Sequence, residues 1–96
     1  MKFRFLAPAE EEMLEAAFYY EMQVESLGTN FLEIIEKAIT EIVEKPDIWP
    51  KIEQGIQRRL IRRFPYSILY TVHEDEVLIG AVMHHKQKPR YWIGRL

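Results

Sequence analysis

The chain has 96 residues, which is the size of one domain with a small core. Its 48% apolar and 29% charged side chains exclude disorder of the whole, and the absence of cysteine excludes disulfides, thiolate metal sites and cysteine nucleophiles. A net charge of −2 hides a division between residues 1–50, which carry −7, and residues 51–96, which carry +5 and suit an anionic partner.

The first expected elements are a short strand and a long helix. Residues 2–6 alternate polar and apolar side chains, as in a half-buried strand. Pro8 suits the first turn of a helix, and the glutamates at 10–12 favour the positive end of its dipole. Gly28 is expected to end this helix. Its apolar face should consist of Met13, Ala17, Tyr20, Val24 and Leu27.

A second helix should follow after a very short turn. Asn30 and Glu33 have the spacing of a capping box, which predicts its start. Pro46 should end it, because the residue before a proline avoids the helical region. Two helices joined so closely should pack as an antiparallel hairpin. The apolar stripe of the second helix consists of Phe31, Ile35, Ala38, Ile39, Ile42 and Val43.

The rest of the chain predicts a loop, three strands and an irregular tail. The loop should span residues 46–57, and the strands residues 57–64, 66–73 and 76–84. Their short connections predict an antiparallel meander, with the helical hairpin on one face and the opposite face partly open. The expected fold class is therefore α+β, one domain over residues 1–96 in the order β-α-α-β-β-β.

The predicted strand at 57–64 is the first candidate binding surface. It holds four arginines within six residues. Alternation should place Arg58 and Arg62 on one face and Arg59 and Arg63 on the other, so that one pair lines the open face. Such a cluster suits an anionic or protein partner, but arginine stems also cover apolar surface while their charged heads stay in water. The pattern leaves these two roles open.

The tail is the second candidate, because basic and aromatic side chains alternate along it. This composition suits nucleic acid and, equally, protein interfaces. We expect Trp92 to pack back onto the sheet. Adjacent histidines in a strand point to opposite faces, so no shared metal site is expected, although either one could act as a general acid or base. The residues concerned are His84, His85, Lys86, Lys88, Pro89, Arg90, Tyr91, Trp92 and Arg95.

Targeting and membrane segments are not expected. The N-terminal apolar stretch is broken by Arg4, unlike a signal peptide, and no stretch approaches the roughly 20 apolar residues of a spanning helix. The chain also has no zinc-protease motif, phosphate loop or nucleophile elbow. We therefore expect a cytoplasmic protein that needs no metal, cofactor or membrane.

In element order and length, the whole chain resembles the RelE/ParE superfamily of bacterial toxin–antitoxin proteins. Residues 17–20 (Ala-Phe-Tyr-Tyr), 27–31 (Leu-Gly-Thr-Asn-Phe) and 63–70 (Arg-Phe-Pro-Tyr-Ser-Ile-Leu-Tyr) carry part of the resemblance. Residues 81–95 carry most of it. There an apolar strand, a histidine, a basic loop, a proline, an aromatic pair and an arginine look like the ParE-type ending.

The resemblance implies a toxin of a type II module, of the kind that serves plasmid stabilisation, neutralised by a cognate antitoxin. A toxin–antitoxin heterotetramer is a common assembly of such modules. RelE-like members cleave messenger RNA on the ribosome without a metal, whereas ParE-like members inhibit DNA gyrase. RelE-like ribonucleases have an arginine directly after the tyrosine that opens the middle strand, where this chain has Ser67. This departure favours the ParE-like branch, which needs no catalytic residue.

Two alternatives remain open. One is a ribonuclease acting on the ribosome and messenger RNA, in which the resemblance assigns the chemistry to Arg59, Arg63, His85, Lys88 and Tyr91. The other is a degenerate member that binds its partner without being toxic. For gyrase or antitoxin binding, the candidate residues are Arg58, Arg59, Arg62, Arg63, His84, Lys86, Lys88, Arg90, Tyr91, Trp92 and Arg95.

Overall fold

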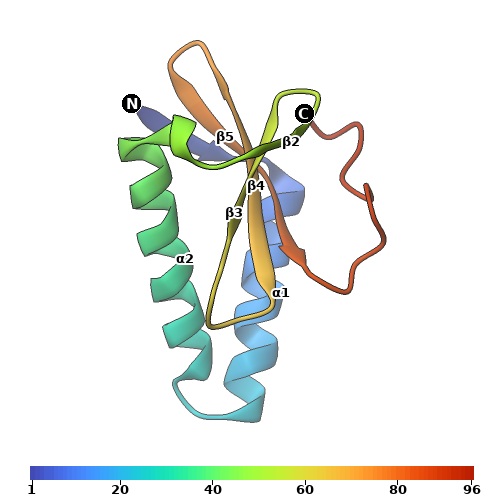
Figure 1. The fold of residues 1–96 in the computed structure, drawn as a ribbon. Coiled ribbons are helices and arrows are strands. Elements are labelled where there is room, and N and C mark those ends of the chain that lie inside the picture. Colours follow the sequence, from blue (N-terminus) through green and yellow to red (C-terminus); the bar gives the residue numbers. More distant parts are fainter.

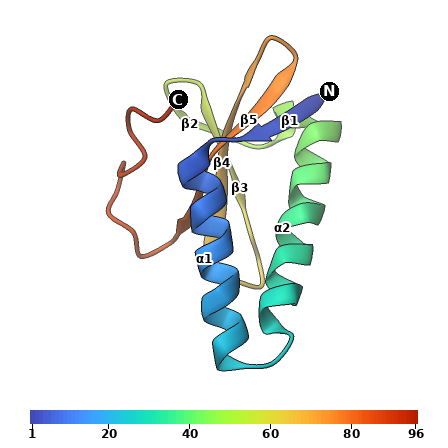
Figure 2. The same cartoon turned by 180° about the vertical axis from the view of Figure 1, so that it is seen from behind.

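The structure is a computed structural model that describes all residues, 1–96. Two helices, α1 (Ala7–Gln23) and α2 (Leu27–Glu44), form the predicted antiparallel hairpin and cover one face of a five-stranded sheet (Figures 1 and 2). This is the α+β architecture that the sequence predicts. Neither helix combines the length and the apolar character needed to cross a membrane.

The sheet brings the first and last strands of the chain together. Its order is β1-β5-β4-β3-β2, in which β1 runs parallel to β5 and all other neighbours are antiparallel. The predicted meander is confirmed as β3-β4-β5. The strand bounds are β1 Lys2–Phe5, β2 Lys51–Glu53, β3 Ile56–Leu60, β4 Tyr66–His73 and β5 Glu76–His84.

The segment between α2 and β4 differs from the prediction. The expected loop at 46–57 contains a short 3-10 helix, η1 (Pro46–Ile48), and the additional strand β2. A tight turn at Gln54 and Gly55, both with positive φ, returns β2 to β3. β3 stops at residue 60 instead of 64, because the chain turns there and buries Ile61 and Phe64 against the helices.

The turn between the helices is also different from the prediction. α1 ends at residue 23, so Gly28 lies inside α2 and does not end the first helix. A Cβ at this position would collide with the backbone oxygen of Ala17, so glycine permits the close crossing of the two helices. Asn30 is not the cap of α2. The N–H groups of Ser26 and Gly28 are bonded instead to the Glu21 carboxylate of α1, at 2.8 and 2.9 Å.

Replacing Gly28 with Ala should destabilise the hairpin. The new methyl group meets backbone, which cannot move aside without shifting a helix, and such overpacking costs about 1–3 kcal/mol. Alanine regains roughly 1 kcal/mol of helix propensity, so we expect a net loss of up to about 2 kcal/mol in urea unfolding. The exposed neighbour Thr29→Ala serves as control and should be neutral. Equal stability of the two variants would contradict the crossing argument.

The core lies between the hairpin and the sheet. The α2 stripe is confirmed, with Val43 only partly buried. α1 contributes mainly small side chains (Ala9, Ala16 and Ala17), and Val24, predicted on its inner face, is 59% exposed. An aromatic cluster of Tyr20, Phe31, Phe64 and Tyr66, with ring centroids 4.8–6.3 Å apart, joins the hairpin to the turn between β3 and β4.

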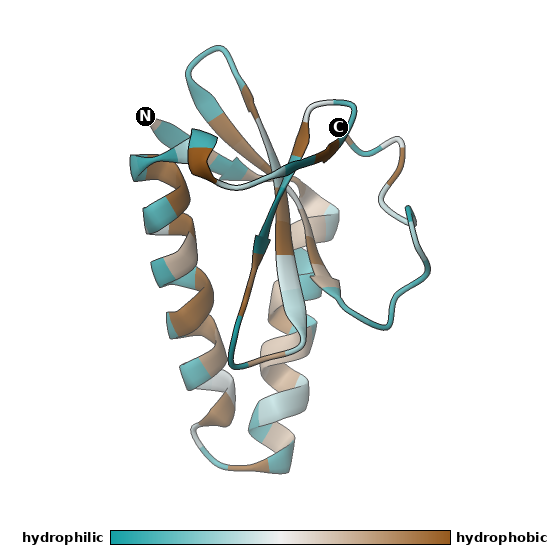
Figure 3. Ribbon diagram, viewed as in Figure 1, coloured by the Kyte–Doolittle hydropathy of each residue, from teal (hydrophilic) through white to brown (hydrophobic).

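The opposite face of the sheet is partly covered by the tail. A second cluster of Ile56, Leu69, Ala81 and Trp92 is buried there, and Trp92 is only 6% exposed, as expected for a residue that packs back. The rest of the tail is mostly hydrophilic and runs in turns along one side of the molecule (Figure 3). The sheet face that was predicted to be partly open is therefore covered at this cluster and exposed elsewhere.

Candidate functional site

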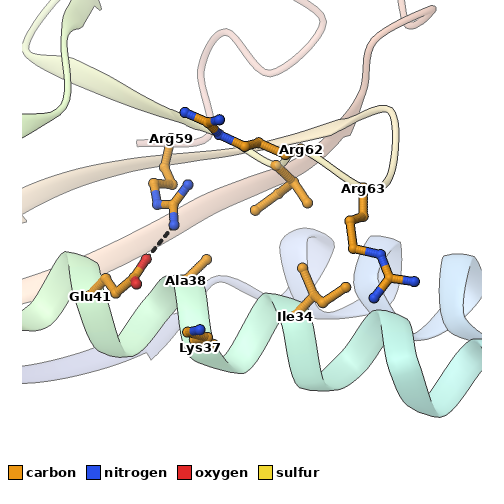
Figure 4. A pocket seen from close by; sticks show the side chains of 8 residues that line it. Ile34, Lys37, Ala38, Glu41, Arg59, Arg62 and Arg63 are labelled. Carbon is orange, nitrogen blue, oxygen red and sulfur yellow. Dashed lines mark hydrogen bonds and ion pairs between the residues drawn. The ribbon is translucent and has the colours of Figure 1, made fainter.

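A groove with a volume of about 230 Å³ lies between α2 and the turn that joins β3 to β4 (Figure 4). Its single carboxylate, Glu41, is paired with Arg59. Its other three cations form no ion pair within the chain and are exposed. The groove therefore offers unpaired positive charge to a partner. It is lined by Ile34, Lys37, Ala38, Glu41, Arg59, Ile61, Arg62 and Arg63.

The two arginines of the turn, Arg62 and Arg63, are held at the surface by buried residues on both sides of them. Ile61 and Phe64, at 3% and 7% exposure, anchor the turn on both sides of Arg62 and Arg63. Strand pairing has already ended at Leu60, so the strict alternation predicted for this segment does not continue. Figure 4 shows Arg63 reaching toward α2, whereas the Arg62 guanidinium points away from it.

Arg59 belongs to the groove but is held by the fold. Its guanidinium pairs with Glu41 of α2, donates to the Leu60 carbonyl at 2.8 Å, and lies 5.0 Å from the ring centroid of Trp49. Its side chain is only 20% exposed. These contacts make Arg59 a residue that joins β3 to α2, with little of it left for a partner.

Arg58 lies on the opposite face, as alternation predicts. It is paired in register with Leu69 of the second cluster, and its Nε donates to Ser67 Oγ at 2.9 Å. Ser67 Oγ is also 2.9 Å from His85 Nε2. Because the oxygen accepts from Arg58, its own proton is available to His85, which favours the neutral imidazole. Burial, and then the charge of Arg58, lower the pKa of His85.

This arrangement makes a pH-dependent contribution to stability. The pKa of His85 is lower in the folded chain than in the unfolded chain, so its contribution is present above about pH 6.5 and is lost as the pH falls through the folded pKa. Between pH 7.5 and 5, we expect the melting temperature of wild type to fall more than that of His85→Asn. The exposed His73→Asn is the control, and its circular-dichroism melting curves should follow wild type. Parallel profiles for all three proteins would contradict the prediction.

The tail is held to α1 by one carboxylate. Glu12 Oε1 accepts from the Val82 N–H and from Arg95 Nη1, both at 3.0 Å. Its Oε2 accepts from Tyr91 Oη at 2.6 Å and from Arg95 Nη2 at 3.0 Å. Burial, and then the hydrogen bond to Glu12, raise the pKa of Tyr91, so that its phenol stays a donor. Arg95 also donates to the Gly80 carbonyl at 3.1 Å and lies over the Tyr91 ring.

Four of the tail residues predicted to bind a partner are thus engaged within the chain. Tyr91 and Arg95 bind Glu12, and Trp92 is buried. Arg90 forms an ion pair with Glu53 of β2 at 2.9 Å, although both groups remain accessible. The contacts of these four residues hold the tail against α1, β2 and the sheet.

The two histidines and the two lysines of the tail are arranged differently. His84 stands edge-on against the ring of Tyr66, on the face opposite to His85, as expected for adjacent residues at a strand end. Its Nδ1 accepts from the Lys86 N–H at 3.0 Å. Lys86 and Lys88 are exposed and form no ion pair. No group of three or more metal-ligating side chains gathers in the structure.

Of the five residues of the ribonuclease alternative, Arg63 and His85 line one common hollow beside the β3–β4 turn. Arg59 lines the groove beside α2 and is paired with Glu41, and His85 also contacts Ser67. Tyr91 binds Glu12 of α1, and Lys88 lies in the exposed tail. Arg59 and Tyr91 are thus bound to carboxylates away from this hollow, and the five side chains do not form one site.

The Glu12 carboxylate accepts four hydrogen bonds and the Ser67 hydroxyl contacts Arg58 and His85, and neither residue was predicted as part of a site. Glu12 is one of three consecutive glutamates, and no local pattern distinguishes it from its neighbours. Ser67 was noted only as the residue that stands in place of an arginine. Both acquire their contacts from segments distant in sequence, which local patterns do not report.

Comparison with known proteins places these features in context. A family described as "ParE toxin of type II toxin-antitoxin system, parDE" matches residues 3–89. A solved structure described as "Chromosomal ParDE TA system from P. aeruginosa" has a TM-score of 0.65, with 13% sequence identity, over 88% of this chain and 95% of that chain. At this identity the likeness shows the fold alone. No curated protein matches the chain.

Proposed function

Because the chain belongs to the ParE toxin family of type II toxin–antitoxin systems, we propose that it inhibits DNA gyrase and that a cognate antitoxin neutralises it. The observation that carries the proposal is the groove between α2 and the β3–β4 turn. Lys37, Arg62 and Arg63 face solvent there without a partner in the chain. The phosphates of gyrase-bound DNA carry negative charge, which such cations attract.

The engagement of two of the ribonuclease residues within the chain supports the same choice. Cleavage of a phosphodiester needs fixed cations and proton-transfer groups around one reacting phosphate. Here Arg59 is paired with Glu41 and Tyr91 is bound to Glu12, so neither joins Arg63 and His85 at the hollow beside the β3–β4 turn. Inhibition by binding needs an accessible surface and no such convergence.

A supercoiling assay tests the proposal directly. Purified protein should prevent gyrase from supercoiling a relaxed plasmid, and its induction in bacteria should cause filamentation and a DNA-damage response. In a translation reaction with ribosomes, messenger RNA should stay intact. Cut messages with normal supercoiling would replace the proposal with the ribonuclease function. Unaffected growth and supercoiling would mean a non-toxic family member.

The proposal includes the setting of the protein. Gyrase acts in the bacterial cytoplasm, so the toxin is proposed to act there. The proposed antitoxin is a small protein, which we expect to be encoded by an adjacent reading frame. Co-expression should yield a complex of two toxins and two antitoxins, which light scattering on a sizing column would measure.

A further inference from the structure

Two hollows adjoin the β3–β4 turn, which spans residues 61–65. One is the basic groove beside α2, and the other, with a volume of about 530 Å³, reaches the start of the tail. Arg62 and Arg63 line both hollows. Arg63 reaches toward α2 and the Arg62 guanidinium points away from it, so the turn presents cations in two directions (Figure 4).

The second hollow has basic side chains and no carboxylate. Its lining includes Arg62, Arg63 and His85 and no acidic residue. The His85 N–H donates to the Pro65 carbonyl at 2.8 Å, which fixes the start of the tail beside the turn. Lys86 follows directly, is exposed and forms no ion pair. Cations from two segments that are distant in sequence are thereby brought to one surface.

The fold does not use the cations of the turn. Arg59, Arg90 and Arg95 each form an ion pair with a glutamate. Arg62 and Arg63 form none and are exposed, although the chain as a whole is acidic, with a net charge of −2. A polyanion would supply the missing negative charge, and the release of its condensed counterions would drive binding.

Duplex DNA has the charge pattern that fits this surface. Phosphates line both edges of each groove of the double helix, so a turn with cations in two directions can meet both strands. Guanidinium groups also bind phosphate oxygens in a bidentate manner. The exposed Glu33 and Glu36 of α2 repel a polyanion from the helix. The contact is therefore confined to the turn and the start of the tail.

We propose that the protein binds duplex DNA directly, without gyrase, by placing the β3–β4 turn at a groove of the double helix, where Arg62, Arg63 and Lys86 contact phosphates. The choice of DNA among polyanions rests on the proposed function, in which the target enzyme holds DNA. Contacts to the backbone fix a position on the duplex but carry no sequence information, so binding has no sequence preference. The protein thus has an affinity of its own for the DNA that gyrase holds.

Fluorescence anisotropy of a short labelled duplex, in the absence of gyrase, tests the site. Three phosphate contacts predict that log Kd rises with log salt concentration with a slope of about 3. Arg62→Gln/Lys86→Gln should reduce the slope to about 1 and raise Kd by about 10-fold or more at low salt. The matched control, Lys2→Gln/Lys51→Gln, removes the same charge from the edge strands β1 and β2 and should keep the wild-type slope. Melting curves verify that each variant is folded.

The outcomes separate this inference from the proposed function. Wild type that does not bind the duplex at low salt, or equal slopes for the two double variants, would overturn the site even if gyrase inhibition stands. Duplex binding through the site by a protein that leaves supercoiling unaffected would support the inference and refute the proposed function. Displacement of the duplex by poly-L-glutamate at equal charge concentration would assign the surface to acidic proteins, and tighter binding of an RNA duplex would assign it to RNA. Either of these two results would overturn the proposal.

Discussion

Replacing Glu12 with Gln is expected to lower the free energy of unfolding by about 2–3 kcal/mol. The carboxylate accepts four hydrogen bonds, two of them from Arg95, and both side chains are only 20% exposed. Removing one partner of a partly buried charged pair leaves the other charge poorly solvated, and partial exposure reduces the cost below that of a fully buried pair. In a domain of this size, the loss corresponds to a fall in melting temperature of roughly 10–20 °C.

The adjacent Glu11→Gln is the matched control for this prediction. Glu11 lies on the same helix but is exposed and has no partner, so its loss should change stability by less than about 0.5 kcal/mol. Limited proteolysis supplies a second measurement, because a tail released from Glu12 should be cut sooner. If the two variants unfold alike, the tail is held by Trp92 and not by the carboxylate.

Reversing the charges of the turn, Arg62→Glu/Arg63→Glu, should reduce gyrase inhibition by about 100-fold while the melting temperature changes little. Both residues are exposed and unpaired, so the fold does not depend on them. A partner that recognises the groove would meet two negative charges in place of two positive ones, and like-charge contacts cost several kcal/mol. The concentration needed for half-inhibition of supercoiling is the quantity to measure.

The control for the Arg62→Glu/Arg63→Glu variant makes the same change in net charge on another part of the surface. Lys2→Glu/Lys51→Glu alters two exposed lysines on the edge strands and should inhibit as wild type does. Arg59→Glu is not a suitable test, because a carboxylate there would face Glu41 and destabilise the fold. If the turn variant and the lysine variant inhibit equally well, the basic groove is not the gyrase-binding surface.

The sequence predicts well those elements that bury a single apolar face against one other part of the fold. The α2 stripe from Phe31 to Ile42 and the meander could be predicted because one clear apolar pattern runs along each element. In α1, by contrast, apolar residues lie on two faces, and only packing against the sheet decides that Ala9 and Ala16 are inside and Phe18 outside. β2 is three residues long and carries no readable pattern.

The candidate site was predicted by residue type but not by arrangement. The cluster of arginines is visible in the chain, but the end of pairing at Leu60 sends Arg62 and Arg63 to the groove together. The tail residues were expected to meet a partner because they are basic and aromatic. Tyr91 and Arg95 instead meet Glu12, which lies 79 and 83 residues away in the chain. Contacts of this range leave no local trace in a sequence.

The parallel pairing of β1 with β5 has a consequence for synthesis. Lys2 is paired with Glu76, and Glu12 binds Arg95. Neither the sheet nor the contact that holds the tail to α1 can therefore form until nearly the whole chain has left the ribosome. Until then, the nascent hairpin exposes the apolar side of α2 that later becomes core. Contacts of such long separation also make the final step slow. A delay is thereby built into the topology: the residues of the basic groove, of which Arg63 is the last, are synthesised before the sheet that supports β3 can close.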